Sequence, residues 1–588
     1  MPGPPPFEDS RRLTGPSLWL GSPGVVLEAP LPGAHEERTR LRWASLVEAL
    51  RRCLGWADGP LCARVHARGA TLAFTAPEDQ LYTATELNEW AWQQALEETS
   101  EAAWLRLHAP GHPLVGDESS ATATLMASAA GEARPDLLAL LQESRLRGVP
   151  AYLDEAQLSL GAGCGHEAWP IDALPESEAI PWGRLHGIPT ALVTGSNGKT
   201  TTTRLLAAMV AAQGVATGYT CTDGICIGGE LLKPGDFSGP VGARTVLRDR
   251  RVEVAILETA RGGLLRRGLA VPRAAVAVVT NVSTDHFGEY GIHALEDLAA
   301  VKFVVAQAVE EGGLLVLNAD DDQLVALGPL HACALGWFSL KDDHPLLQAH
   351  RRLKGATCGL WQGHLRLSRL GEVHDLGEVT AMPLSIEGRA AYNISNMAAA
   401  ALAAGALGVP PRVIAEVLRS FGSVPKDNPG RLERWQVGGI QVYLDYAHNP
   451  EGLDGLLQVA VAARPARLGL LLGQAGNREE AAIRELAAMA ARHAPDLVIL
   501  KDLEGYMRGR VPGEVPDILR AELLGCGLSG ECLRTILSEE AAVLALLAWA
   551  STGDVLVLPV HGAEAKQTLR SLLNHLVAIG WRAGDPVA

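Results

Sequence analysis

The stretch from Thr194 to Thr201, which reads Thr-Gly-Ser-Asn-Gly-Lys-Thr-Thr, limits the possible folds of this chain more than any other stretch. The apolar run at 190–193 predicts a short buried strand before it. Apolar side chains at helical spacing follow it, and Gly214 is a typical end of a helix. Backbone N–H groups of the turn and of the first helical turn then converge on one point, where the helix dipole favours an anion. The stretch therefore predicts a phosphate-binding loop in an α/β fold.

Two side chains of this loop suit a bound nucleotide. Lys199 can reach the terminal phosphates, and the Thr200 hydroxyl can hold a magnesium ion that bridges them. The strict phosphate-loop pattern has a glycine where Val193 stands, so an ordinary strand-to-helix turn is the alternative. The flanking strand and helix favour nucleotide binding, because they supply the structural context that the motif requires.

Composition excludes some classes of protein. With 588 residues, 47% of them hydrophobic and 20% charged, the chain is expected to form a soluble protein of three or four domains. The formal net charge of -16 argues against a nucleic-acid binder, although it does not forbid local cationic pockets for anionic ligands. Nine cysteines without metal-like pairs indicate reduced thiols in a cytosolic protein. We find no signal peptide and no apolar run of membrane-spanning length, so we expect a cytoplasmic protein without membrane contact.

Composition and periodicity divide the chain into three folded units. Residues 1–165 combine short strands with helical patterns, for example at 36–53, which predicts an α+β domain. Prolines among acidic residues indicate a linker at 166–187. Residues 188–418 alternate strands and helices, which is typical of a parallel α/β sheet. Residues 419–588 show the same alternation without a phosphate loop, and we expect this domain to bring a second substrate and close over the first.

Polar residues follow the predicted strands of the central domain. Glu258 follows the strand at 252–257, and His286 lies a few residues after the strand at 275–280. Ligands of such sheets bind outside the carboxyl ends of the strands, so we expect both side chains to meet Thr200 over the phosphates. A hydroxyl and a carboxylate suit magnesium, whereas an imidazole is less expected and suits manganese better. A structural ion pair for Glu258 and an ordinary loop position for His286 are the alternatives.

Several motifs occur together in the second and third units. They are the loop at 194–201, Glu258, the segment from Asn281 to His286, Asn393 and Asn396 one turn apart on a predicted helix, and Asp-Tyr-Ala-His-Asn-Pro at 445–450. Over about residues 187–588 the chain resembles the Mur ligase family, which also includes the folate polyglutamate synthetases. The strings at 223–229 and 257–268 resemble the cyanophycin synthetase branch, and 12–16 resembles its N-terminal domain. That branch has an ATP-grasp domain where this chain has only 166–187.

The resemblance implies a P-loop Mur-ligase central domain and a C-terminal Rossmann-like domain, preceded by the α+β domain. It also implies an ATP- and Mg²⁺-dependent ligase, in which a carboxylate takes the γ-phosphate and an amine then displaces phosphate. The implied catalytic residues are Lys199, Glu258, His286, His448 and Lys302, the last at a position that is carbamylated in many members. The implied nucleotide contacts are Gly195, Asn197, Gly198, Lys199, Thr200, Thr201, Asn281, Asn393, Asn396, Arg431 and Asp445. The implied metal ligands are Thr200, Glu258 and His286.

Candidate substrate contacts follow from the same resemblance. An acidic acceptor needs cations, and the candidates are Arg261, Arg266 and Arg267, with Arg244 and Arg248 as further candidates that an ion-pair face would explain equally well. Arg508 and Arg510 stand where the resembled branch reads its amino acid, and Asp502 could receive a cationic one. We expect the partners to be an amino acid, a carboxylate-bearing peptide or polymer, and a stand-alone ATP-grasp ligase that makes the backbone. We also expect a homo-oligomer.

Three other interpretations stay open. The chain could be a ligase for a small carboxylate metabolite, a non-catalytic Mur-like subunit of a separate polymerase, or a simple phosphate-loop hydrolase.

Two residues of the third domain depart from the family pattern. Asn477 stands where an aspartate is common, and Glu433 stands where we expect an asparagine.

Overall fold

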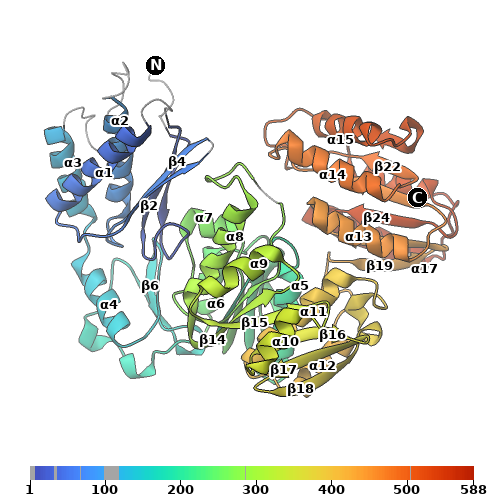
Figure 1. The fold of residues 1–588 in the computed structure, drawn as a ribbon, viewed down its shortest axis with the longest axis horizontal. Helices are drawn as coiled ribbons and strands as arrows, with labels where there is room; N and C mark the ends of the chain where they lie inside the picture. The colour runs from blue at the N-terminus through green and yellow to red at the C-terminus, as the bar shows by residue number, and fades with distance from the viewer. Residues whose placement is uncertain are drawn as a thin grey trace.

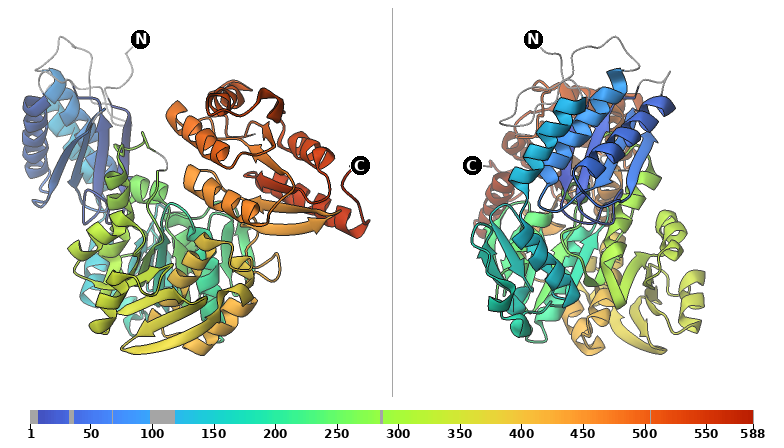
Figure 2. Two further views of the ribbon diagram at one scale, coloured as in Figure 1. Left: turned by 45° about the vertical axis from the view of Figure 1, so that its right-hand side comes forward. Right: turned by 90° about the vertical axis from the view of Figure 1, so that its left-hand side faces the viewer.

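The computed structural model describes residues 7–31, 36–66, 68–97, 118–284, 287–503 and 505–587. An N-terminal, a central and a C-terminal unit follow one another along the chain (Figure 1). The C-terminal unit sits above one end of the central sheet, and the N-terminal unit lies on the other side of the central unit (Figure 2). Within the described part of the chain, no helix is long and apolar enough to cross a membrane.

The N-terminal unit is an antiparallel sheet covered on one face by helices (Figure 1). Its strand order is β1-β2-β4-β3. The elements are β1 (Asp9–Leu13), β2 (Gly24–Ala29), α1 (Glu36–Cys53), β3 (Leu61–His66), β4 (Gly69–Thr75), α2 (Leu81–Glu97) and α3 (Glu118–Glu132). Trp43, Trp90 and Trp92 are fully buried between the sheet and the helices. Burial of such large side chains supplies much of the hydrophobic stabilisation of this small unit.

A small three-stranded sheet joins this unit to the central one. It follows α4 (Pro135–Leu146) and consists of β5 (Ala151–Leu153), β6 (Gln157–Leu160) and β7 (Glu167–Pro170). The segment 166–187, expected to be a linker, thus begins with a strand. Its apolar side chains, Trp169, Ile180 and Trp182 among them, pack on Leu158 and Leu160. Pro170 ends β7, so at least this proline lies in a strand.

The central unit is built on an 11-stranded sheet with the order β11-β10-β9-β12-β8-β13-β14-β15-β16-β17-β18. The strands from β9 to β16 in this order are parallel. The strands are β8 (Thr190–Thr194), β9 (Thr217–Cys221), β10 (Gly224–Ile227), β11 (Glu230–Pro234), β12 (Val254–Glu258), β13 (Ala274–Val279), β14 (Val309–Asn318), β15 (Ala334–Ser339), β16 (Ala356–Trp361), β17 (His364–Arg369) and β18 (Glu372–Glu378). All five residues of β8 are buried, so the phosphate loop starts from the middle of the sheet.

Helices cover both faces of this sheet. They are α5 (Lys199–Ala211), α6 (Pro240–Leu247), α7 (Arg261–Arg267), α8 (Leu295–Phe303), α9 (Asp322–Leu327), α10 (Pro345–Arg352), α11 (Ala391–Ala406) and α12 (Pro411–Ser420). Helices α5 and α11 pack in one apolar cluster, and α6, α7 and α8 pack in the cluster on the opposite face. The N-terminal unit docks at α7, where the Arg11 side chain donates a hydrogen bond to the Leu265 carbonyl at 2.8 Å.

The C-terminal unit has a six-stranded sheet with the order β19-β20-β24-β21-β22-β23 and helices on both faces. Its strands are β19 (Glu433–Val437), β20 (Ile440–Asp445), β21 (Leu468–Leu472), β22 (Leu497–Leu500), β23 (Leu533–Thr535) and β24 (Val555–Pro559). Its helices are α13 (Pro450–Ala462), α14 (Glu480–Arg492), α15 (Glu514–Gly525), α16 (Glu539–Trp549) and α17 (Ala563–Ala578). The carboxyl end of β20 faces the central unit, and the loop that follows it contacts the phosphate loop, where Asn449 donates to the Asn197 side-chain oxygen at 2.9 Å.

Candidate functional site

The phosphate loop depends on two glycines. Gly198 precedes α5 with φ of +84°, and a Cβ there would lie 2.1 Å from the Asn396 amide oxygen. Gly195 has φ of +145°, and a Cβ there would lie 1.8 Å from the Thr280 hydroxyl. Only glycine combines these conformations with these close approaches. The loop can therefore keep its backbone turned toward a ligand.

The N-terminus of α5 is open to an anion. None of the side chains that the structure describes caps it, so the first N–H groups of the helix are available to a ligand. The Lys199 ammonium lies over the loop and donates to the carbonyls of Gly195 and Ser196, both at 3.0 Å. This places a positive charge beside the backbone donors, as phosphate binding requires.

Glu258 lies beside the loop, at the end of the strand next to β8. It is 2% exposed, and its two oxygens accept hydrogen bonds at 2.8 Å from the hydroxyls of Thr200 and Thr222. The structure thus brings together two of the three side chains expected at the metal. Thr222 was missed in the sequence, although it follows β9, the parallel neighbour of β12, and so satisfies the same rule of strand ends.

These oxygen atoms fit a magnesium ion. A hydroxyl and a buried carboxylate are hard donors, and magnesium usually completes its shell with waters and phosphate oxygens. Among the residues that the structure describes, no group of three or more His, Cys, Asp or Glu side chains could hold a metal by itself. The third expected ligand, His286, lies outside the described residues. Its role stays a prediction.

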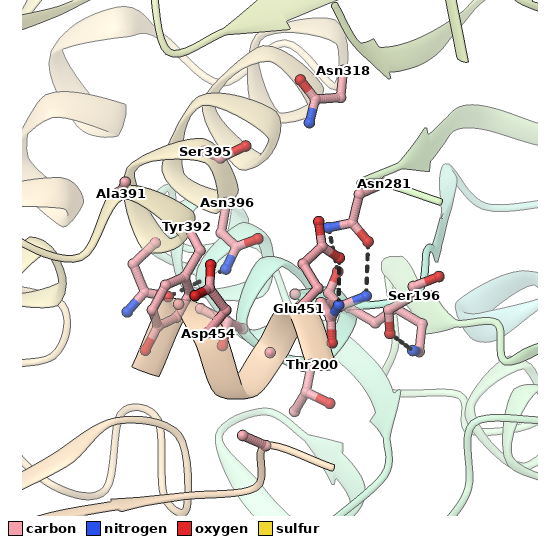
Figure 3. Close-up of a pocket in the computed structure, with 18 of the residues that line it drawn as sticks. Ser196, Thr200, Asn281, Asn318, Ala391, Tyr392, Ser395, Asn396, Glu451 and Asp454 are labelled. Carbon is pink, nitrogen blue, oxygen red and sulfur yellow. Dashed lines mark hydrogen bonds between the residues drawn. The ribbon is translucent and has the colours of Figure 1, made fainter. Parts of the chain in front are cut away.

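A cavity of about 620 Å³ opens beside the loop, between the central and C-terminal units. Figure 3 shows its side chains converging from α5, α11 and α13. Its lining includes these predicted residues: Asn197, Gly198, Lys199, Thr200, Thr201, Glu258, Asn281, Asn393, Asn396, Arg431, Asp445 and His448. The size and the mixture of amide, hydroxyl and charged groups suit a nucleotide.

Three of the four predicted asparagines hold the wall of the cavity in place. Asn281 grips the loop, because its amide oxygen accepts from the Asn197 N–H at 2.8 Å and its amide nitrogen donates to the Asn197 carbonyl at 3.2 Å. Asn393 is buried and donates to the Leu384 carbonyl at 3.0 Å. Its oxygen accepts from Asn396 at 3.2 Å, which orients the Asn396 side chain toward Gly198.

Several lining residues were missed in the sequence. They are Asn318, Asp320, Asp321, Asp322, Tyr392, Ser395, Glu451 and Asp454. Burial raises the pKa of Asp321, although its carboxylate accepts from the Val282 N–H at 2.6 Å. Asn318 ends β14, so the strand-end rule could have found this group, whereas Glu451 and Asp454 depend on how the C-terminal unit docks.

The C-terminal unit contributes charged side chains to the cavity. Arg431 donates to the Thr200 hydroxyl at 3.2 Å, and its guanidinium lies 4.4 Å from the centre of the Tyr446 ring. Asp445 accepts from the N–H groups of Leu432 at 2.6 Å and Ala447 at 2.8 Å, and burial raises its pKa. His448 lies on the wall, with Nδ1 3.2 Å from the Tyr446 carbonyl oxygen.

The predicted acceptor arginines lie away from the lining of this cavity. Arg261 pairs with Glu289 at 2.5 Å, and Arg266 donates to the Tyr290 hydroxyl at 3.0 Å. Arg267 donates to the Arg12 carbonyl of the N-terminal unit at 3.4 Å. Arg244 and Arg248 both pair with Asp154, as in the ion-pair alternative.

The remaining predicted residues are not among those that line the cavity. Lys302 is buried in α8. Asp502 accepts from the Gly513 N–H at 2.9 Å, and Arg510 donates to the Gly476 carbonyl at 2.9 Å, so both fix loops at the carboxyl edge of the C-terminal sheet. Arg508 is exposed.

The two positions that depart from the family pattern also differ in their surroundings. Glu433 pairs with Arg570 at 2.5 Å, which gives its carboxylate a structural partner. Asn477 is exposed.

Comparison with known proteins gives the family. The model of the Mur ligase middle domain matches residues 193–404, and that of the Mur ligase glutamate ligase domain matches 430–559. Cyanophycin synthetase of Synechocystis sp. is 35% identical over 410 residues, which are 68% of this chain and 46% of that enzyme. The UDP-N-acetylmuramoyl-L-alanyl-D-glutamate–2,6-diaminopimelate ligase of Chlorobaculum tepidum is 29% identical over 399 residues, or 65% of this chain and 73% of that enzyme.

A solved murein peptide ligase from Psychrobacter arcticus is 16% identical, with a TM-score of 0.45 over 68% of this chain and 78% of its own. The chain spans less than half the length of the cyanophycin synthetases that it matches. Both Mur ligase domains are matched, and they meet at one phosphate loop. The chain therefore belongs to the Mur ligase family, whose members are ATP-dependent, ADP-forming ligases.

Proposed function

We propose that this chain joins the amine of an amino acid to a carboxylate on an aspartate-rich peptide or polymer that another ligase makes. One observation carries the proposal: Glu258 of the central unit and Arg431 of the C-terminal unit both bond to the Thr200 hydroxyl, at 2.8 and 3.2 Å. A carboxylate for a metal and a cation for a phosphate thus meet at the start of α5. The likeness to cyanophycin synthetase supports the choice of a polymer.

The first step would activate the carboxylate. One carboxylate oxygen attacks the γ-phosphorus of ATP, and the bond between that phosphorus and the oxygen of the β-phosphate breaks. ADP departs, and the carboxylate has become an acyl phosphate. Lys199 and Arg431 would offset the charge that builds up on the phosphate oxygens. Thr200 and Glu258 would hold Mg²⁺, which supplies further positive charge to the β- and γ-phosphates.

The second step would form the amide. The amine nitrogen attacks the carbonyl carbon, and the tetrahedral intermediate expels inorganic phosphate while the nitrogen loses a proton to solvent. His448 would reach the phosphates as the C-terminal unit closes. Asn281, Asn393, Asn396 and Asp445 would contact the nucleotide.

The acceptor would bind outside the nucleotide cavity. Arg261, Arg266 and Arg267 lie on α7, which contacts the N-terminal unit, and this fits an anionic chain that reaches the γ-phosphate from that side. Residues 1–165 would contact the polymer, residues 188–418 would bind ATP, and residues 419–588 would close over the bound substrates. It also includes carbamylation of Lys302, a homo-oligomer and a stand-alone ATP-grasp ligase as partner.

A panel of substrates tests this proposal. The full chain with ATP and Mg²⁺ is offered each amino acid together with either an aspartate-rich peptide or a small carboxylate metabolite. We expect phosphate release only when amine and peptide are both present, with a peptide mass gain of one amino acid less water. Product from a small carboxylate alone would favour the metabolite ligase. Phosphate release without amine would indicate a hydrolase, and no release under any condition would indicate a non-catalytic subunit.

A further inference from the structure

Asp223 gathers three cations at the junction of two units. It lies in the turn between β9 and β10 of the central unit. Arg204 of α5 approaches its carboxylate at 2.9 Å, Lys566 of α17 at 3.2 Å and Arg431 at 3.6 Å. Two of these cations come from the C-terminal unit. One central carboxylate therefore attracts the C-terminal unit through two separate side chains.

This cluster is largely withdrawn from water. The side chains of Lys566, Arg431 and Asp223 are 8, 16 and 24% exposed. Burial lowers the pKa of Lys566. Burial would raise the pKa of Asp223, but the three cations outweigh it and hold that pKa below its usual value. Charges in such surroundings interact more strongly than exposed pairs do. Loss of the Asp223 charge would leave the three cations close together without the carboxylate that they share.

The cluster also fixes the direction of Arg431. The Lys566 ammonium lies 5.0 Å and the Arg431 guanidinium 4.4 Å from the centre of the same Tyr446 ring. Arg204 donates to the Pro429 carbonyl at 3.0 Å, two residues before Arg431. With its backbone and its guanidinium both held, Arg431 points at the Thr200 hydroxyl.

We propose that Asp223 and Lys566 form an interdomain positioning pair, which holds the C-terminal unit closed and keeps Arg431 over the start of α5. Lys566 is not among the residues that line the cavity, so it acts through Asp223 and Arg431 rather than on a substrate. Its effect on turnover rests on the ligase function proposed above. Its effect on closure does not.

Other contacts that reach the C-terminal unit have a different character. Asn197 of the loop bonds to Glu451 at 2.8 Å and to Asn449 at 2.9 Å, so only one of those three side chains is charged. Arg68 of the N-terminal unit pairs with Glu479, but these side chains are 54 and 48% exposed. Such exposed pairs contribute little to stability. Ala390 and Tyr392 of the central unit also pack on the apolar core of the C-terminal unit, but this packing does not orient Arg431. Compared with the exposed Arg68–Glu479 pair, the Asp223 cluster is the more buried ionic contact to the C-terminal unit.

Four variants test the pair: Lys566→Met, Lys566→Arg, Asp223→Asn and the double variant Asp223→Asn/Lys566→Met. We expect Lys566→Met and Asp223→Asn each to lower kcat by on the order of 10- to 100-fold, because a displaced Arg431 no longer meets the phosphate. The KM for the amino acid should change much less. The double variant should lose less than the product of the two single effects, because both changes remove one interaction. Lys566→Arg should restore most of kcat.

Closure is measured separately, so that failure of the ligase proposal does not hide the result. Fluorescence labels on the central and C-terminal units report their distance with and without ATP. We expect Lys566→Met to shift the distance to longer values under both conditions, and Lys566→Arg to resemble the wild type. Arg484→Gln is the matched control, because it removes two ion pairs of a half-exposed arginine, with Glu480 and Glu522, within the C-terminal unit. Unchanged distances and native kcat in Lys566→Met would overturn the inference, as would equal effects of Lys566→Met and Lys566→Arg.

Discussion

The central and C-terminal units each place a strand, a turn and a helix at the cavity, yet the two helices begin differently. Helix α5 follows Gly198, and in the described part of the chain no side chain caps it. Helix α13 follows Asn449, whose side-chain oxygen accepts from the Gly452 N–H at 2.8 Å, and Pro450 removes a further donor. One helix end is thus free for a phosphate and the other is closed by its own residues. The topology thus places a helix N-terminus at the cavity in both units, but the presence or absence of a cap determines whether that N-terminus can bind an anion.

The two units accordingly contribute different groups. The central unit presents backbone N–H groups, whose positions the glycines fix. The C-terminal unit presents side chains such as Arg431 and Asp445, whose positions depend on contacts with other elements. Backbone donors need no reorganisation on binding, whereas long side chains need neighbours to hold them. Three substitutions sharpen this contrast.

Lys199→Ala is expected to have the largest effect. It removes the positive charge beside the open end of α5, and turnover should fall by about 10² to 10³ or more, as for loss of a preorganised donor to the transition state. Ligation is measured by ADP release with the best substrate pair, and circular dichroism confirms the fold. Near-native ligation by a folded Lys199→Ala protein would contradict the role of this loop.

Gly198→Ala should weaken ATP binding, by less than Lys199→Ala lowers turnover, and should also lower the stability of the fold. A Cβ at this left-handed position costs about 1–2 kcal/mol, and the side chain would also push Asn396 out of place. Calorimetric titration with ATP and the Tm give the two readouts. Gly525→Ala in α15 is the control, since a Cβ there meets nothing within 4 Å. If both variants bind ATP equally well, the loop does not need its glycine.

Asn449→Ala should have the smallest effect. Loss of the cap of α13 is expected to cost about 1 kcal/mol, and loss of the contact to Asn197 should weaken ATP binding only slightly. Ser538→Ala, which removes the cap of α16 in the same unit, should lower the Tm similarly and leave binding unchanged. Tighter ATP binding by Asn449→Ala would contradict this prediction, because it would mean that the uncapped N-terminus of α13 itself binds an anion.

Local patterns predicted many elements closely. The helix at Glu36–Cys53 has the bounds expected from its apolar pattern. The strand expected at 252–257 lies at Val254–Glu258 instead, because Glu258 pairs in register with Val193 of the neighbouring strand. The local pattern around Glu258 does not indicate a pairing partner that lies 65 residues earlier in the chain.

The sequence by itself determined the phosphate loop, because its glycines, its lysine and the flanking strand and helix are neighbours in the chain. It also indicated Glu258 and Asn281, because residues after parallel strands share one edge. Only the tertiary structure decided that Thr222 bonds to Glu258, that Arg510 holds a loop, and that Asp223 meets Lys566. These contacts join segments from different strand ends or different units, and their geometry depends on how whole units pack. The charges of neighbouring residues in the sequence do not indicate how these units pack.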